Sequence, residues 1–256
     1  MHEYKTLKDL TKIILLFNTF QFEERSVTEI SKILSMLPSK VSRMLGTIEK
    51  DGFLEKNPET KKYRLGIRFF ELGVVYAFHL PLRRIIRPHI EQMAKELNLT
   101  VGWAILRNNR VIVVDRIQNM NIDMLAQRIG LNLPIHTTAI GKLLLAYLPE
   151  EEQDKILESI DLVKLTDATM VDKKIIKESL KVVKERGYAT DEGETHEDLN
   201  GIAAPIKNST GDVVAAIHLM GENTRTKPQE FFQFASFLKE KALFISRQLG
   251  YSSIGR

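Results

Sequence analysis

The sequence predicts an α+β protein with two domains, and three observations carry this prediction. The chain has 256 residues, which at about 150 residues per domain corresponds to one or two domains. Apolar residues recur at helical spacing over the first 50 residues and are followed by one short hairpin. Beyond residue 100, short β-rich runs alternate with helical stretches. We therefore expect domains over 1–66 and 81–251, joined by a helix over 67–80.

The composition excludes several classes of protein. Hydrophobic residues make up 43% and charged residues 27% of the chain, as in globular proteins and unlike disordered ones. No cysteine occurs, which excludes disulfides, cysteine-bound metals and a thiol nucleophile. The longest apolar runs, such as 143–148, fall far short of the roughly 20 residues of a membrane span, and the N-terminus does not resemble a signal peptide. We expect a soluble cytoplasmic protein with no membrane contact.

The first domain is expected to contain three helices and a hairpin. Helices are predicted over about 6–18, from the Ser26–Glu29 capping box to about Ser35, and from Pro38 to Asp51. The short link between the second and third helices gives the layout of a helix-turn-helix. Strands over 53–56 and 63–65 then flank a polar turn that carries Lys61 and Lys62. This hairpin is suited to act as a wing beside the helix-turn-helix.

The outer face of the third helix points to DNA binding. It carries short hydroxyls and cations, namely Ser39, Lys40, Ser42, Arg43 and Thr47. Cations on a helix in the major groove neutralise phosphates, and an arginine can read a guanine edge, so Arg43 is the expected base reader. The chain has 37 Lys and Arg against 33 Asp and Glu, and this mild net charge of +4 is compatible with DNA binding without requiring it. The alternative is that the basic face is only solvated.

The segment 67–80 indicates a dimer or a second packing partner. Its apolar residues lie on more than one face of any helix, and such a helix must be covered on several sides. A second copy of the chain is one possible cover, and the C-terminal domain is the other. The sequence does not decide between them. The next helix, over 82–97, begins the second domain, with Arg83, Arg84 and Arg87 on its outer side either solvated or ion-paired.

The second domain is predicted to be a sheet with helices packed on it. Strands are expected over 101–106, 111–117, 124–128, 188–190, 201–207 and 213–219, and helices over 139–147, 150–159, 172–186 and 228–249. Asn108-Asn109 indicates a hairpin turn between the first two strands. Trp103, the single tryptophan, fits either a pocket wall or a core position. The stretch 133–142 is typical of a capped helix start, whose free N–H groups favour a small anion, although most capped helices bind nothing.

Several motifs resemble the IclR family of transcriptional regulators. SVTEI at 26–30, PSKVSRML at 38–45, and the GFL and YRLG of the hairpin resemble its winged helix-turn-helix. LPIHTTAIGKLLLAYLP at 133–149 and GIAAPIKNSTGDVVAAIHLMG at 201–221 resemble its ligand-binding domain, so that the resemblance covers nearly the whole chain. It implies a winged helix-turn-helix joined by a linker helix to a GAF-like α+β domain that binds a small metabolite, often an organic acid. It also adds Thr28 to the residues expected to contact DNA.

The resemblance further implies an effector site in the second domain. Its expected residues are Thr138, Ala139, Ile140, Gly141, Asp191, Gly201, His218 and Met220. Gly201 stands where many members carry a cysteine, and His218 and Met220 stand where many place two serines, so the effector should differ from the one that those members bind. Because histidine titrates near neutral pH, a charged pair of His218 and Asp191 would hold an acidic ligand. The alternative is that His218 and Met220 are core or surface residues.

Together these observations predict a sequence-specific DNA-binding transcription regulator controlled by a small metabolite, with repression the commoner role in the family. Its expected partners are double-stranded operator DNA, the effector and further copies of the chain, as a dimer or a dimer of dimers. No cofactor, catalytic residue or metal site is expected, because the common catalytic motifs do not occur and the acidic run 191–198 is typical of a solvated loop. Two alternatives remain, a metabolite-processing enzyme and a DNA-binding protein that needs no effector.

Overall fold

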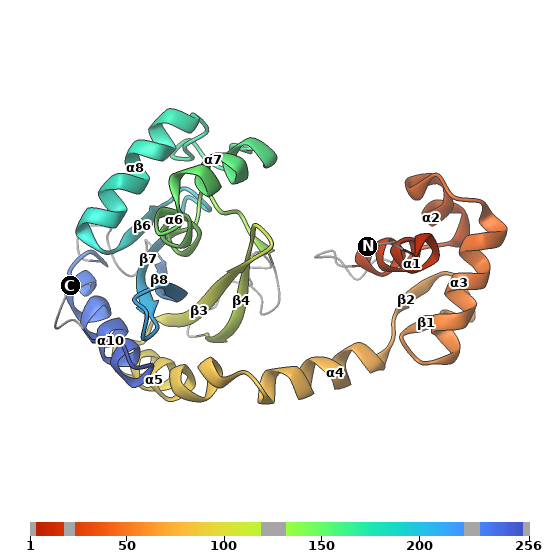
Figure 1. Cartoon of the computed structure of the whole chain (residues 1–256), viewed down its shortest axis with the longest axis horizontal. Helices are drawn as coiled ribbons and strands as arrows, with labels where there is room; N and C mark the ends of the chain where they lie inside the picture. The colour runs from red at the N-terminus through yellow and green to blue at the C-terminus, as the bar shows by residue number, and fades with distance from the viewer. Residues whose placement is uncertain (1–3, 18–23, 119–131, 223–230, 253–256) are drawn as a thin grey trace. The chain divides into compact units, whose positions relative to one another are not determined.

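The structure, a computed structural model, describes residues 4–17, 24–118, 132–222 and 231–252 (Figure 1). They divide into two units, 1–80 and 81–256. Two expectations, the strand over 124–128 and the start of the last helix at Pro228, lie outside the described residues. Within the described ranges, no helix is both long enough and apolar enough to cross a membrane.

In its described residues, 4–17 and 24–80, the N-terminal unit contains four helices and a hairpin. These are α1 (Lys5–Leu15), α2 (Val27–Leu34), α3 (Pro38–Lys50), β1 (Leu54–Lys56), β2 (Tyr63–Leu65) and α4 (Ile67–Phe78). The predicted capping box is present: the Glu29 N–H donates to Ser26 Oγ at 3.2 Å, and the Ser26 N–H donates to Glu29 Oε2 at 2.6 Å. Pro38 occupies the first turn of α3, where a missing N–H costs nothing, and this fixes the start of that helix.

Apolar side chains from three helices hold this unit together. Ile13, Ile30 and Leu45 are fully buried and belong to one cluster with Tyr63 of the hairpin. β1 and β2 pair antiparallel, and the backbone of Tyr63 also pairs with Arg25, just before α2. This bridge anchors the hairpin to the helical part. As a result, α3 has one face fixed in the core and leaves the other face outward.

The C-terminal unit is a six-stranded antiparallel sheet with helices on both faces. Its elements are α5 (Pro81–Leu97), β3 (Thr100–Arg107), β4 (Arg110–Ile117), β5 (Asn132–Leu133), α6 (Ala139–Ala146), α7 (Glu150–Ser159), α8 (Lys173–Arg186), β6 (Ala189–Glu192), β7 (Leu199–Lys207), β8 (Val213–Glu222) and α10 (Phe234–Gln248). The strand order is β5-β4-β3-β8-β7-β6. Asn108 and Asn109 both have positive φ and form the predicted two-residue turn between β3 and β4.

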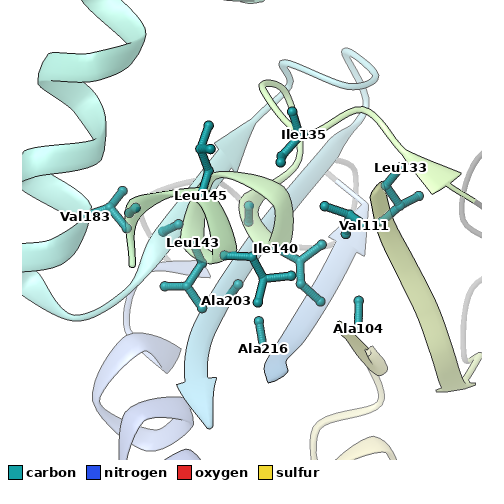
Figure 2. Packing of buried hydrophobic residues seen from close by; sticks show 14 of the residues in the cluster. Ala104, Val111, Leu133, Ile135, Ile140, Leu143, Leu145, Val183, Ala203 and Ala216 are labelled. Carbon is teal, nitrogen blue, oxygen red and sulfur yellow. The ribbon is translucent and has the colours of Figure 1, made fainter. Parts of the chain in front are cut away.

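The two faces of this sheet are covered by different helices (Figure 1). On one face, Ala104, Ala203 and Ala216 share a buried cluster with the apolar residues of α6 and α8 (Figure 2). These three alanines are small enough for α6 to lie close to the strands. On the opposite face, Trp103 is fully buried in a cluster with residues of α5 and α10, so it occupies a core position.

An ion-paired carboxylate attaches α5 to the sheet. Asp115 of β4 is buried. Its Oδ2 lies 3.0 Å from Arg83 Nε, and its Oδ1 lies 2.7 Å from Arg87 Nη1. The two arginines are therefore ion-paired, which was one of the two expectations. Because a buried carboxylate is costly unless it is paired, this contact specifies where α5 sits on the sheet.

Candidate functional site

The outward face of α3 presents most of the predicted DNA-contacting residues together. Ser39, Ser42, Arg43 and Thr47 are all exposed, and Thr28 is exposed on the neighbouring α2. The Thr47 hydroxyl donates to the backbone carbonyl of Arg43 at 2.9 Å, and the Arg43 side chain itself is exposed. The arrangement offers one arginine flanked by three short hydroxyls, the combination suited to base edges and phosphates in a major groove.

Two of the predicted lysines are held by carboxylates that the sequence reasoning missed. Lys40 Nζ is ion-paired and hydrogen-bonded to Asp9 Oδ2 of α1, and this contact lowers the pKa of the Asp9 carboxyl. Lys62 Nζ lies 3.0 Å from Glu29 Oε1. By contrast, Lys61 is exposed at the turn of the hairpin. Without DNA, the charges of Lys40 and Lys62 are therefore partly offset. Only tertiary contacts reveal these pairs, because 31 residues separate Asp9 from Lys40.

The segment before α6 and the first turn of that helix are packed closely together. Thr138 caps the helix, since its Oγ1 accepts from the Gly141 N–H at 3.1 Å and donates to the Pro134 carbonyl at 2.9 Å. A Cβ on Gly141 would lie 2.6 Å from the Ile135 carbonyl oxygen, so only glycine fits there. The close neighbour of Gly141 is thus another stretch of backbone.

Four of the predicted effector residues lie on the sheet face covered by α6. Asp191 of β6, Gly201 of β7 and Met220 of β8 are paired in one row across three strands, so their side-chain directions share a face. A Cβ on Gly201 would lie 3.5 Å from the Ala139 Cβ, which places the first turn of α6 opposite this row. His218 lies two residues from Met220 on the same face. The structure thus brings together sequence segments that are up to about 80 residues apart.

Asp191 already holds its own loop. Its Oδ1 accepts from the backbone N–H groups of Glu194 at 2.8 Å and Thr195 at 3.2 Å, and its Oδ2 accepts from the Thr195 hydroxyl at 2.6 Å. Burial raises the pKa of the Asp191 carboxyl, while the Thr195 hydrogen bonds and the Lys142 charge oppose the shift. A carboxylate has about four acceptor positions, so one remains for a ligand hydroxyl.

The expected ion pair of His218 with Asp191 is not formed. His218 is paired in register with Gly102 of β3 on one side and Ala203 of β7 on the other. Its Nε2 is buried, and no described residue forms a hydrogen bond with it. A Cβ on Gly102 would lie 2.5 Å from this Nε2, so the glycine leaves the space that the ring occupies. Burial lowers the pKa of His218 to about 4, assisted by the positive charge of Arg116. The ring is therefore neutral at physiological pH.

A buried ion pair beside this row was not predicted. Lys142 of α6 and Glu194, two residues beyond β6, are both buried, and Lys142 Nζ donates to Glu194 Oε1. Burial raises the pKa of Glu194 to about 7, although the Lys142 charge acts in the opposite direction. One signal in the sequence could have found it, because Lys142 is the single charged residue in the otherwise largely apolar stretch 139–148. Among the residues that the structure describes, no cluster of three His, Asp or Glu side chains is arranged to hold a metal ion.

Comparisons with known proteins agree with these features. A family model described as the C-terminal domain of the bacterial transcriptional regulator IclR matches residues 74–247. The HTH-type transcriptional regulator XynR of Escherichia coli K12 is 31% identical over 240 residues, covering 94% of this chain and 95% of XynR. The HTH-type transcriptional repressor AllR of the same organism is 28% identical, covering 88% of this chain and 83% of AllR.

Similarity of fold extends over both units. An IclR homologue from Microbacterium hydrocarbonoxydans, solved in complex with 4-hydroxybenzoate, has a TM-score of 0.79 at 23% identity and covers 96% of this chain and 99% of that one. The family model spans more than half of the chain, and XynR is similar over nearly all of it. The chain therefore belongs to the IclR family of transcriptional regulators.

Proposed function

We propose that this protein is a transcriptional repressor that binds operator DNA through α3 and is controlled by a small organic acid. The single observation that carries the proposal is the exposed face of α3, where Arg43 stands among short hydroxyls on a helix whose other face is locked in the core. Family membership supports the same function. Repression is supported by the role named for AllR.

In this proposal each winged helix-turn-helix reads half of a palindromic operator. Arg43 reads a base edge, while Ser39, Ser42 and Thr47 position α3 on the phosphates, and Lys61 of the wing contacts the backbone. Lys40 and Lys62 contribute only when DNA phosphates replace Asp9 and Glu29 as their partners. Part of the positive charge of the winged helix-turn-helix, which we call the DNA head (residues 4–65), is thus offset by its own carboxylates before DNA binds. This limits its sequence-independent attraction to DNA.

The heads are paired by a second copy of the chain. No residue of α4 is buried, although the helix is largely apolar, and Phe70 and Phe78 are 68% and 71% exposed. Tyr76 and Ile67 are also more than half exposed. A helix this apolar is not stable facing water along its whole length. We therefore assign α4 to the interface between two copies, which sets the distance between their recognition helices.

The effector binds at the first turn of α6 and the row of Asp191, Gly201 and Met220, which are packed against each other without a ligand. The remaining acceptor position on Asp191 takes a ligand hydroxyl, and the N–H groups at the start of α6 favour its carboxylate. The complex of the Microbacterium homologue with 4-hydroxybenzoate, an acid that also bears a hydroxyl, supports this class of ligand. A regulator of this kind binds its ligand without turning it over, which separates it from the enzyme alternative.

The proposal is tested by selecting bound genomic fragments with the purified protein at near-physiological salt, in competition with random DNA. We expect a recurrent palindromic site. Arg43→Ala should weaken binding to that site by about 1 to 3 kcal/mol per recognition helix. Its effect on binding to random DNA should be smaller. Arg247→Ala, which removes an exposed arginine from α10, is the matched control and should leave both affinities unchanged. Equal binding of all fragments would instead favour a DNA-binding protein without sequence preference.

A further inference from the structure

A cleft lies beside the buried ion pair and is lined by other residues than those predicted to bind the effector. It has a volume of about 460 Å³. Its lining residues include Lys142 of α6, Val182 and Arg186 of α8, and the loop residues Met170 and Glu194. None of the eight residues expected to bind the effector lines this cleft. We call it the α8 cleft. Its position at the β6 edge of the sheet makes it a separate site within the C-terminal unit.

One of the residues that line the α8 cleft has a polar atom without a partner among the residues that the structure describes. Glu194 is 6% exposed, its Oε1 accepts from Lys142, and no described group donates to its buried Oε2. A buried carboxylate oxygen without a donor is unfavourable, and such atoms are rare in folded proteins. The negative charge of Glu194 disfavours an anion beside it, and its Oε2 can still accept a hydrogen bond. A ligand that brings a charged or neutral N–H donor would satisfy it.

The rim of the α8 cleft supplies the opposite charge. Arg186 is fixed in place, because its Nε donates to the Tyr188 carbonyl at 2.7 Å, its Nη2 donates to Thr190 Oγ1 at 3.1 Å, and its guanidinium stacks 4.3 Å above the Tyr188 ring. A guanidinium has five N–H donors in a fixed geometry, and these two contacts use only part of them. The remaining donors suit a carboxylate.

The charges and the apolar wall together define the class of ligand. The lining residues include two basic side chains, Lys142 and Arg186, and two acidic ones, Glu192 and Glu194, so the cleft favours a molecule that carries both an acidic and a basic group. Ala168, Met170, Val182 and Val183 provide an apolar wall. We propose that the α8 cleft binds a free amino acid with a small or medium apolar side chain. Its ammonium group donates to Glu194, its carboxylate is held by Arg186, and its side chain contacts the apolar wall.

The experiment is isothermal titration of the full chain with L-alanine, L-valine and L-methionine, each compared with its 2-hydroxy acid. We expect at least one of the amino acids to bind saturably to one site per chain. The corresponding hydroxy acid lacks the ammonium group and should bind to this site at least tenfold more weakly. Absence of saturable binding for all three amino acids would overturn the proposal. Equal binding of the amino acid and its hydroxy acid would also overturn it, because Glu194 would then have no role in recognition.

Matched variants locate the site without disturbing the buried pair. Val182→Trp fills the α8 cleft from an exposed position on α8 and should reduce amino-acid affinity at least tenfold. Ile175→Trp introduces the same side chain at another exposed position of α8 that does not line the cleft, and should leave the affinity unchanged. Unchanged affinity in Val182→Trp would place the binding elsewhere and refute the assignment. Operator binding, measured on the same samples, tests the regulatory function separately.

Discussion

Replacing His218 by glutamine should remove a specific part of the pH dependence of stability. The pKa of this imidazole is lowered from 6.5 to about 4 in the folded chain. The folded protein therefore binds fewer protons than the unfolded chain between these values, and it loses stability as the pH falls from about 6.5 to 4. Each pKa unit corresponds to about 1.4 kcal/mol, so the free energy of unfolding should fall by about 3 kcal/mol over this range because of His218 alone. Glutamine does not titrate and should not contribute this loss.

The assay uses the single tryptophan. Trp103 is fully buried in the C-terminal unit, on the sheet face opposite to His218, so its fluorescence reports the unfolding of that unit. Urea unfolding at a series of pH values between 7 and 4 gives the free energy of unfolding for the native chain and for His218→Gln. The difference between the two should change by about 3 kcal/mol across the series. Because carboxylates titrate in both proteins, they cancel in this difference.

A second replacement provides the control. Serine is smaller than glutamine and packs differently, so the two variants should have different free energies of unfolding at pH 7. Serine does not titrate either, so the difference in free energy of unfolding between His218→Ser and the native chain should change with pH as it does for His218→Gln. Parallel curves for the native chain and both variants between pH 7 and 4 would refute the reasoning. They would mean that the ring reaches solvent in the folded state and titrates as it does in an unfolded chain.

Three further predictions follow from contacts described above. Asp115→Asn leaves the two α5 arginines without their buried carboxylate and should lower the free energy of unfolding, read from tryptophan fluorescence, by about 3 to 5 kcal/mol. Asp9→Asn releases Lys40 for DNA and should steepen the salt dependence of operator binding, raising the slope of log affinity against log salt by about 1 per head; an unchanged slope would show that this lysine does not reach a phosphate. Gly102→Ala places a methyl group against the His218 ring and should cost about 1 to 3 kcal/mol of stability, and a neutral effect in urea unfolding would contradict the packing.

Much of the fold was predictable because local signals and burial agree. The capping box at Ser26, the proline at the start of α3 and the Asn108-Asn109 turn each determine backbone geometry within a few residues, and all three are found where expected. The strand over 63–65 has its predicted bounds, whereas β3, β4, β7 and β8 of the second domain were predicted slightly too short. β8, for example, continues to Glu222, since its pairing with β7 extends beyond the run of β-forming residues. Pairing partners, rather than local preference, set the ends of these strands.

The electrostatic details of the candidate sites were not predictable in the same way. Whether His218 is charged depends on its burial and on the missing side chain at Gly102, which lies more than 100 residues earlier in the chain. Likewise, the partners of Lys40 and Lys142 come from distant segments. A sequence pattern indicates which residues share a face of a helix or strand, but the pKa of a group depends on what the tertiary fold places against that face.

The loop that follows β6 offers a physical route by which an effector can act beyond its own site. The Thr195 hydroxyl lies 2.6 Å from Asp191 Oδ2 and 3.1 Å from Thr137 Oγ1, next to the start of α6, and a hydroxyl has one proton to donate. The effector hydroxyl proposed for the remaining acceptor position of Asp191 would weaken the hydrogen bond from Thr195 to this carboxylate. The Thr195 proton would then be shared more with Thr137, which would change the contact between the loop and the segment before α6. Glu194 belongs to the same loop, so the ligand proposed for the α8 cleft would act on the same contact. By linkage, the two ligands must then alter each other's affinity by equal factors, and a coupling of about 1 to 3 kcal/mol is the size that such switches use.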